Sequence, residues 1–120
     1  MSKALEPEQI TRLFVERANA ADAEGMAELY EPDAVMAYPP GSFSVGRAAI
    51  RKVFEAMLES RPTFEQEDAL PSVRSGDLAL TSTAPRDNVG ARAQVARRQP
   101  DGSWLRVLDQ PEFRQPTKQE

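Results

Sequence analysis

The chain contains neither cysteine nor histidine. The absence of cysteine excludes a disulfide framework and thiol chemistry. The absence of histidine excludes a histidine-ligated metal site, a Ser-His-Asp triad and a histidine general base. Carboxylates alone could still bind Mg²⁺ or Ca²⁺, but no segment has the aspartate spacing of an EF-hand loop. We therefore expect no bound cofactor.

Long hydrophobic runs and an excess of positive charge are also missing. No stretch reaches the roughly 20 apolar residues that cross a membrane. Residues 1–10 show no signal peptide, so we expect a cytoplasmic protein without a membrane partner. The formal net charge of −4 makes nucleic acid an unexpected partner. A chain of 120 residues that is 40% hydrophobic and 28% charged fits one soluble domain over residues 1–120.

The first half of the chain predicts helices. Apolar residues recur at helical spacing over residues 8–21, and Asp22 is suited to cap a second, short helix. A third helix is expected over residues 47–59, where an apolar stripe again follows the helical period. One short strand, residues 34–38, is expected between the second and third helices.

The second half of the chain predicts strands. The candidates are residues 63–73, 77–84, 89–99 and 103–110, separated by clusters of turn-forming residues. Such spacing is typical of an antiparallel meander. Because helices come first and strands follow, we expect an α+β domain with the helices packed on one face of the sheet.

Three stretches carry a resemblance to a known family: "NAADAEGMAELYEPDAVMAYPPG" (residues 19–41), "VGRAAIRKVFEAML" (residues 45–58) and "ARRQPDGSWLRVLDQP" (residues 96–111). In order and spacing they resemble the nuclear transport factor 2-like superfamily, above all its SnoaL-like, ketosteroid-isomerase-related branch. The resemblance covers about residues 8–112. It implies a cystatin-like, cone-shaped fold, in which three N-terminal helices wrap a strongly curved, mostly antiparallel sheet. It also implies a pocket at the open end of the cone and homodimers formed through the sheet.

The family hosts isomerases, cyclases, hydrolases, dehydratases and non-catalytic binding modules, so the fold does not fix the function. Ketosteroid isomerases use an Asp general base whose position here is Tyr38. Their oxyanion-donating Tyr falls on Phe14, and their protonated Asp falls near Gln94. Phenylalanine cannot donate a hydrogen bond, and a phenol is a poor base at neutral pH. We therefore expect that this chain is not a ketosteroid isomerase.

A carboxylate ends the apolar segment "WLRVLDQP" (residues 104–111). Strict alternation places Asp109 on one strand face with Leu105 and Val107, opposite Trp104 and Arg106. A carboxyl group among apolar neighbours holds its proton more readily and could serve as a general acid or base. Alternatively, Asp109 is structural and bonds to the backbone or to an arginine, or a bulge turns it outward.

The other candidate residues are mostly aromatic. Tyr38 follows the expected first strand and could bind a ligand through its hydroxyl, or simply pack its ring. Phe43 lies in the next loop and could act as a lid or a plug. Phe14 and Phe54 lie on helical stripes, which are usually core. The full set of predicted site residues is Asp109 and Tyr38 for catalysis, with Phe14, Tyr38, Phe43, Phe54, Gln94, Leu105 and Val107 for ligand binding.

A small basic cluster is formed by Arg92, Arg97 and Arg98. Adjacent residues of a strand point to opposite faces, so one of the last two could enter the cone and pair with an anionic ligand. The more ordinary role is a solvated or dimer-facing surface. Cross-strand acidic partners are then expected from Glu65, Glu67 and Asp68.

Two functions stay open at this point. The first is a small-molecule pocket protein, with Asp109 and Tyr38 performing acid–base chemistry on a small apolar or oxygenated substrate. The second is a non-catalytic homodimeric module that binds a ligand or another protein. The second is favoured by the loss of all three isomerase positions and by the absence of histidine and cysteine.

Overall fold

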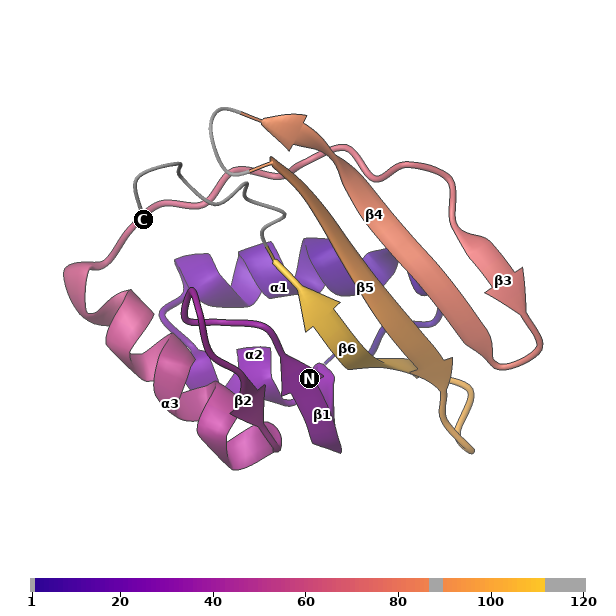
Figure 1. Cartoon of the computed structure of the whole chain (residues 1–120), viewed down its shortest axis with the longest axis horizontal. Helices are drawn as coiled ribbons and strands as arrows, with labels where there is room; N and C mark the ends of the chain where they lie inside the picture. The colour runs from indigo at the N-terminus through magenta and orange to yellow at the C-terminus, as the bar shows by residue number, and fades with distance from the viewer. Residues whose placement is uncertain (1, 87–89, 112–120) are drawn as a thin grey trace.

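The structure is a computed structural model that describes residues 2–86 and 90–111. Its helices are α1 (Gln9–Asn19), α2 (Ala23–Ala27) and α3 (Arg47–Met57), and a 3₁₀ turn (Leu58–Ser60) follows α3. Its strands are β1 (Tyr30–Met36), β2 (Ser44–Val45), β3 (Val73–Ser75), β4 (Leu78–Arg86), β5 (Gly90–Arg98) and β6 (Trp104–Gln110). Figure 1 shows the long strands β4 and β5 crossing the molecule beside the helices.

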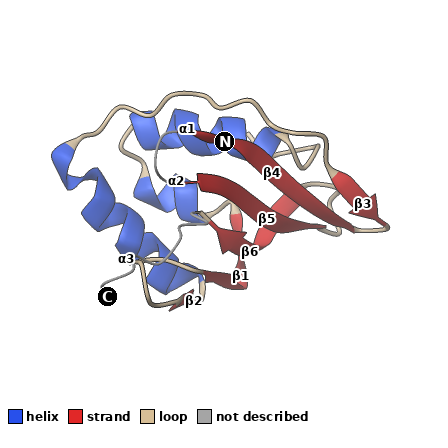
Figure 2. Ribbon diagram, turned by 45° about the horizontal axis from the view of Figure 1, so that its top comes forward, coloured by secondary structure: helices blue, strands red, loops and turns tan. Residues whose placement is uncertain are grey.

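The strands form one sheet in the order β2-β1-β6-β5-β4-β3. All neighbouring pairs are antiparallel except β1 and β6, which run parallel. The helices lie on one side of this twisted sheet (Figure 2). The predicted α+β class, with a curved and mostly antiparallel sheet behind N-terminal helices, is confirmed.

The helices are held against the sheet by their apolar faces. Ile10 and Leu13 of α1 and Ile50 and Phe54 of α3 are buried in one core cluster. Full burial of one such side chain contributes about 1.5–3 kcal/mol. Asp22 caps α2 as predicted, since its carboxylate accepts a hydrogen bond from the Gly25 N–H at 2.9 Å.

The two faces of the sheet differ sharply in chemistry. On the open face one apolar row crosses all six strands in register, and consists of Val45, Val35, Leu108, Val95, Leu80 and Val73. The neighbouring row on the helix-covered face is more polar, and consists of Ser44, Met36, Asp109, Gln94 and Thr81. All five of these residues are buried. At these two rows of the sheet, polar groups therefore lie on the enclosed face and apolar groups on the open face.

A β-bulge in β6 decides which side chains face the helices. Val95 pairs with Leu108 and Ala96 with Arg106, so Val107 is an extra residue in the β5–β6 ladder. The extra residue resets the alternation, and Arg106 and Asp109 both lie buried on the helix-covered face. Strict alternation would have placed these two side chains on opposite faces.

Other sequence predictions need correction. The expected strand over residues 63–73 is wrong, because this segment is a connector with a single bridge, Ala69 to Thr83, before β3 begins. The first strand begins at Tyr30, earlier than the start at residue 34 that the sequence predicts. The strand expected over residues 89–99 is β5, and residue 89 lies outside the described residues. The connector crosses the top of Figure 1 from α3 to β3.

Candidate functional site

A cavity of about 130 Å³ lies between α1, the helix-covered face of the sheet and the connector. Its apolar walls are Phe14 and Val15 on one side and Phe64 on another. The remaining lining residues are polar or charged, apart from one proline: Thr11, Glu65, Glu67, Thr83, Arg92, Gln94, Arg106, Asp109 and Pro111. The volume is enough for a few water molecules or a small organic molecule, since one water occupies about 30 Å³ of liquid.

Three side chains form a hydrogen-bonded cluster at this cavity. The Tyr30 hydroxyl donates to Oδ2 of Asp109 at 2.5 Å. Nη1 of Arg106 donates to the Tyr30 hydroxyl at 3.2 Å and lies 3.7 Å from Oδ2 of Asp109. Asp109 and Arg106 are only 5% and 4% exposed. An ion pair this deep is stable only when its groups are also hydrogen-bonded, as they are here.

Burial fixes the protonation of the cluster's donors. It raises the pKa of Tyr30 well above its usual value, and the charge of Asp109 opposes ionisation further. Burial alone would lower the pKa of Arg106, but Tyr30 and Asp109 outweigh it, so this pKa is raised. At neutral pH Tyr30 is therefore a neutral donor and Arg106 a cation.

Arg106 is also held by aromatic rings and by α1. Its guanidinium carbon lies 5.3 Å from the centre of the Phe14 ring and 5.7 Å from that of Tyr30. Its Nη2 donates to the Thr11 hydroxyl at 3.2 Å. These contacts fix the position of the Arg106 guanidinium. The guanidinium in turn fixes the Asp109 carboxylate that it faces.

Three buried polar atoms at this site have no hydrogen-bond partner among the described residues. They are Oδ1 of Asp109, Nε of Arg106 and Oγ1 of Thr83, which is 3% exposed. All three residues line the cavity. An unpaired buried polar group costs about 1–3 kcal/mol, so such groups usually serve a bound molecule or ordered water.

The structure brings together three of the predicted site residues. Phe14, Gln94 and Asp109 line the same cavity. Gln94 accepts from the Thr81 hydroxyl at 3.0 Å, which fixes its amide. The interior position predicted for Asp109 is found, but its expected neighbours are not, because the bulge pairs it with Arg106. The prediction that Trp104 lies opposite Asp109 is wrong, since both face inward.

The other predicted residues lie elsewhere. Tyr38 packs against the core and does not line the cavity. Phe54 is buried beneath Phe14, with ring centres 5.4 Å apart. Leu105 lines a separate cleft near the β5–β6 turn, and Val107 is the bulge residue. None of these four contributes to the site around Asp109.

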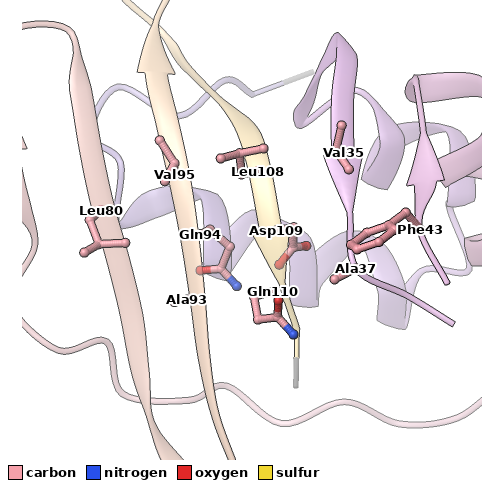
Figure 3. Close-up of a pocket in the computed structure, with 10 residues that line it drawn as sticks. All are labelled: Val35, Ala37, Phe43, Leu80, Ala93, Gln94, Val95, Leu108, Asp109 and Gln110. Atoms are coloured by element: carbon pink, nitrogen blue, oxygen red, sulfur yellow. The ribbon is translucent and has the colours of Figure 1, made fainter. Parts of the chain in front are cut away.

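Phe43 lies on the open face of the sheet and is 71% exposed. It borders an apolar depression of about 300 Å³, together with side chains of the apolar row. Figure 3 shows Leu80, Val95 and Leu108 next to one another on adjacent strands, with Phe43 beyond Val35 and Ala37. Gln94 and Asp109 also line this depression, so the role of Phe43 as a lid or a plug stays a prediction.

Sequence reasoning missed Tyr30 and Arg106, the two partners of Asp109. The signal available was the spacing of Arg106 and Asp109. That spacing places both side chains on the same face of the strand only if a bulge lies between them. Among the arginines, the predicted partner Glu67 is found on Arg92 at 2.6 Å. Arg97 and Arg98 instead bond to Glu31 and Asp77.

Two further functional classes can be addressed in the described part of the chain. No group of three or more acidic residues is arranged to hold a metal ion. None of the described helices combines the length and apolar character needed to span a membrane.

Comparison with solved structures shows the fold. The chain is similar to a putative calcium/calmodulin-dependent protein kinase type II association domain from Thiobacillus denitrificans, with a TM-score of 0.71 and 20% identity over 92% of this chain and 98% of that one. It is also similar to a ketosteroid isomerase-like protein from Erwinia carotovora atroseptica, with a TM-score of 0.65 and 19% identity over 86% and 89% of the two chains. An NTF2-like protein with a cystatin-like fold from Novosphingobium aromaticivorans gives a TM-score of 0.64 and 23% identity over 86% and 78%.

Sequence comparison gives the family. No curated protein matches the chain significantly. The sequence model of the SnoaL-like domain, in contrast, matches residues 11–112, which include every strand and all of α2 and α3. The chain therefore belongs to the SnoaL-like domain family.

Proposed function

We propose that this SnoaL-like protein binds a small oxygenated molecule in the cavity beside Asp109. The observation that carries the proposal is the set of three unpartnered buried polar atoms at one cavity with aromatic walls. A ligand with both a hydrogen-bond donor and an acceptor would satisfy Oδ1 of Asp109 and Nε of Arg106. Its apolar part would lie against Phe14 and Phe64. Such a mixture of apolar walls and a few fixed polar groups is usual in small-molecule sites.

The chemistry open to this site is proton transfer by Asp109. Tyr30 and Arg106 occupy Oδ2, so Oδ1 is the oxygen left to accept or return a ligand proton. Tyr30 acts as a positioning residue, because it holds the carboxylate and does not line the cavity. Arg106 also holds the carboxylate, and it offers Nε to the ligand. Tyr38 has no part in this proposal, since it lies outside the cavity.

The test is a binding screen with Asp109→Asn. Small cyclic alcohols, ketones and lactones would be screened by ligand-observed NMR against the wild type. Compounds that bind should lose at least about tenfold in affinity with Asp109→Asn, because the amide presents a donor where the ligand needs an acceptor. Asp33→Asn, an exposed change, is the matched control and should bind as the wild type does. Circular dichroism checks that both variants fold.

Two results would contradict the proposal: no compound binds the wild type, or Asp109→Asn binds as well as Asp33→Asn. In the second case Asp109 would be a structural ion-pair residue. Native mass spectrometry of freshly purified protein adds an unbiased readout, since a retained small molecule would show as a defined extra mass.

The open face of the sheet supports a second proposal, that two copies of this chain associate through it. The apolar row crosses the whole sheet, and its members Val45, Leu108, Leu80 and Val73 are exposed. Exposed apolar patches of this extent usually mark an interaction site. A second copy is the occupant we propose, because one continuous row can pack against itself about a two-fold axis.

A further inference from the structure

The outer wall of the cavity is the connector between α3 and β3, an irregular segment rather than the expected strand. Phe64 and Glu67 point inward and are half-buried, whereas Thr63, Gln66 and Asp68 are exposed. Both inward residues line the cavity. Residues 62–68, here called the flap, thus separate the Asp109 cluster from solvent.

The flap is fixed at its two ends by different kinds of contact. Near its start, the Asn19 side chain bonds to the Phe64 backbone twice, donating to the carbonyl oxygen at 3.0 Å and accepting from the N–H at 2.8 Å. Just beyond its end, the Leu70 N–H donates to the Ser82 carbonyl oxygen at 2.9 Å. Between these points Nε2 of Gln66 donates to the Arg12 carbonyl oxygen of α1 at 3.3 Å, and Glu67 holds the flap to the sheet.

Glu67 forms an ion pair with Arg92 of β5, with Nη1 and Oε2 2.6 Å apart. The two side chains are 18% and 27% exposed, against 3% and 5% for Asp109 and Arg106 in the deeper pair. The Glu67–Arg92 pair is therefore at intermediate depth, partly screened by water. A pair of this kind holds weakly enough to break and re-form, unlike a fully buried one.

We propose that the Glu67–Arg92 ion pair is the latch of the flap, and that its opening admits small molecules to the Asp109 cavity. The identity of the molecule that enters the cavity rests on the proposed function. Opening of the flap, in contrast, can be measured without any ligand. The flap proposal and the proposed function can therefore be contradicted independently of each other.

The test uses a single cysteine, which the wild-type chain lacks. Thr83→Cys places a thiol at the cavity, and its rate of reaction with iodoacetamide reports how often the flap opens. Adding Glu67→Gln should raise this rate about three- to fivefold, because a partly exposed ion pair contributes that much to the closed state. Exchanging the charges with Glu67→Arg and Arg92→Glu should return the rate toward that of Thr83→Cys alone.

The controls separate opening of the flap from loss of the fold. Ser82→Cys lies next to Thr83 on the opposite face of β4, and its labelling rate should not change with Glu67→Gln. Asp68→Asn, an exposed carboxylate of the flap that does not line the cavity, should leave the labelling of Thr83→Cys within about twofold. An unchanged rate with Glu67→Gln overturns the proposal. Equal acceleration at Ser82→Cys also overturns it, because the whole sheet would then be opening.

Discussion

At the scale of residues, Tyr30 connects the two charges of the buried ion pair. Its hydroxyl donates to Asp109 and accepts from Arg106, and its ring lies 5.8 Å from that of Phe54. The same side chain thus belongs to the core and to the candidate site. This double role explains why a tyrosine stands where a phenylalanine would fill the same space.

Tyr30→Phe should therefore weaken both stability and binding. Removing the hydroxyl leaves two buried partners less well bonded, at a cost of about 1–3 kcal/mol in the free energy of unfolding. Because Asp109 also loses the donor that fixes Oδ2, ligand affinity should fall as well. Urea denaturation and the NMR binding assay measure the two effects. The matched control is Tyr38→Phe, the only other tyrosine, which should change stability by less than about 0.5 kcal/mol.

Tyr30 also predicts how stability depends on alkaline pH. Its pKa is raised in the folded state, so its contribution is fully present below the unfolded value of about 10. Above that pH the unfolded chain ionises first, and the contribution is lost as the pH rises. Stability measured across this range should fall less steeply for Tyr30→Phe than for the wild type. Equal slopes would show that Tyr30 is not shielded as described.

At the scale of elements, β6 shows what a sequence pattern can and cannot predict. The position of the strand was predicted within a residue, since its turn and apolar content are local signals. The bulge at Val107 was not, because it depends on how β6 pairs with β5. The interior position of Asp109 was predicted from strict alternation with Leu105 and Val107, and the bulge breaks that alternation. Its partners Tyr30 and Arg106 were not predicted.

The connector between α3 and β3 shows a different error, because the sequence predicts a strand that the structure does not form. Its composition favours a strand, yet most of it has no strand partner. The Asn19 side chain takes the place of a neighbouring strand at Phe64, and a contact 45 residues apart in sequence leaves no local signal. The cavity wall, and with it the Glu67–Arg92 pair, follows from this tertiary contact rather than from propensity.

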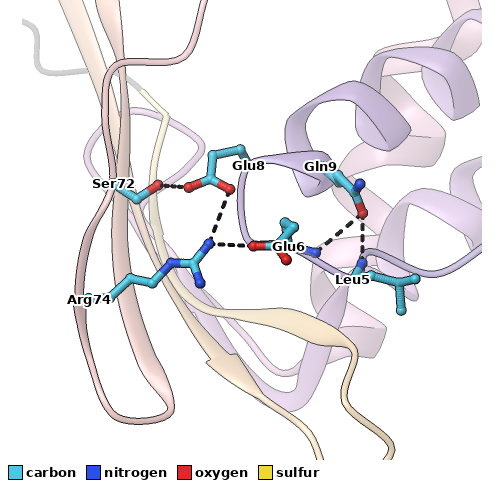
Figure 4. Close-up of polar contacts among 6 residues, drawn as sticks. All are labelled: Leu5, Glu6, Glu8, Gln9, Ser72 and Arg74. Carbon is cyan, nitrogen blue, oxygen red and sulfur yellow. Dashed lines mark hydrogen bonds and ion pairs between the residues drawn. The ribbon is translucent and has the colours of Figure 1, made fainter.

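The segment before α1 is bonded to β3 and to the residue before it (Figure 4). Ser72 donates a hydrogen bond to the Glu8 carboxylate, and Arg74 of β3 pairs with Glu6 at 2.6 Å and with Glu8 at 3.4 Å. The bond from Ser72, with help from Arg74, lowers the pKa of Glu8. The Arg74 guanidinium also covers Trp104, at 5.5 Å from the ring centre.

Ser72→Ala should lower the free energy of unfolding by about 0.5–1 kcal/mol at neutral pH, since the carboxylate it bonds is partly exposed. A carboxylate of lowered pKa stabilises the fold above its unfolded pKa and stops doing so as the pH falls through the folded value. The effect should therefore shrink below about pH 4. Fluorescence of Trp104, the single tryptophan, reports unfolding in urea. Ser75→Ala, on β3 three residues further along the chain, is the control. An effect independent of pH would contradict the account.

At the scale of the whole molecule, the sheet separates two environments. Its helix-covered face encloses the Asp109 cluster, and its open face carries the apolar row. The strands that carry Asp109 and Gln94 also carry Leu108 and Val95, their immediate neighbours in the chain. Association through the open face would therefore hold rigid the same strands that position the site, without covering the cavity or the flap.

The proposed dimer predicts that Leu80→Glu yields a folded monomer. Leu80 is an exposed member of the apolar row, and a two-fold axis would place two copies of it in the interface. Loss of two buried leucines and the burial of two charges should weaken association at least about 100-fold. Light scattering after gel filtration, over a range of concentrations, measures the change. Leu5→Glu, at a still more exposed leucine on the segment before α1, should leave the dimer intact. A wild-type monomer at every concentration would contradict the proposal, and a dimer that survives Leu80→Glu would place the interface elsewhere.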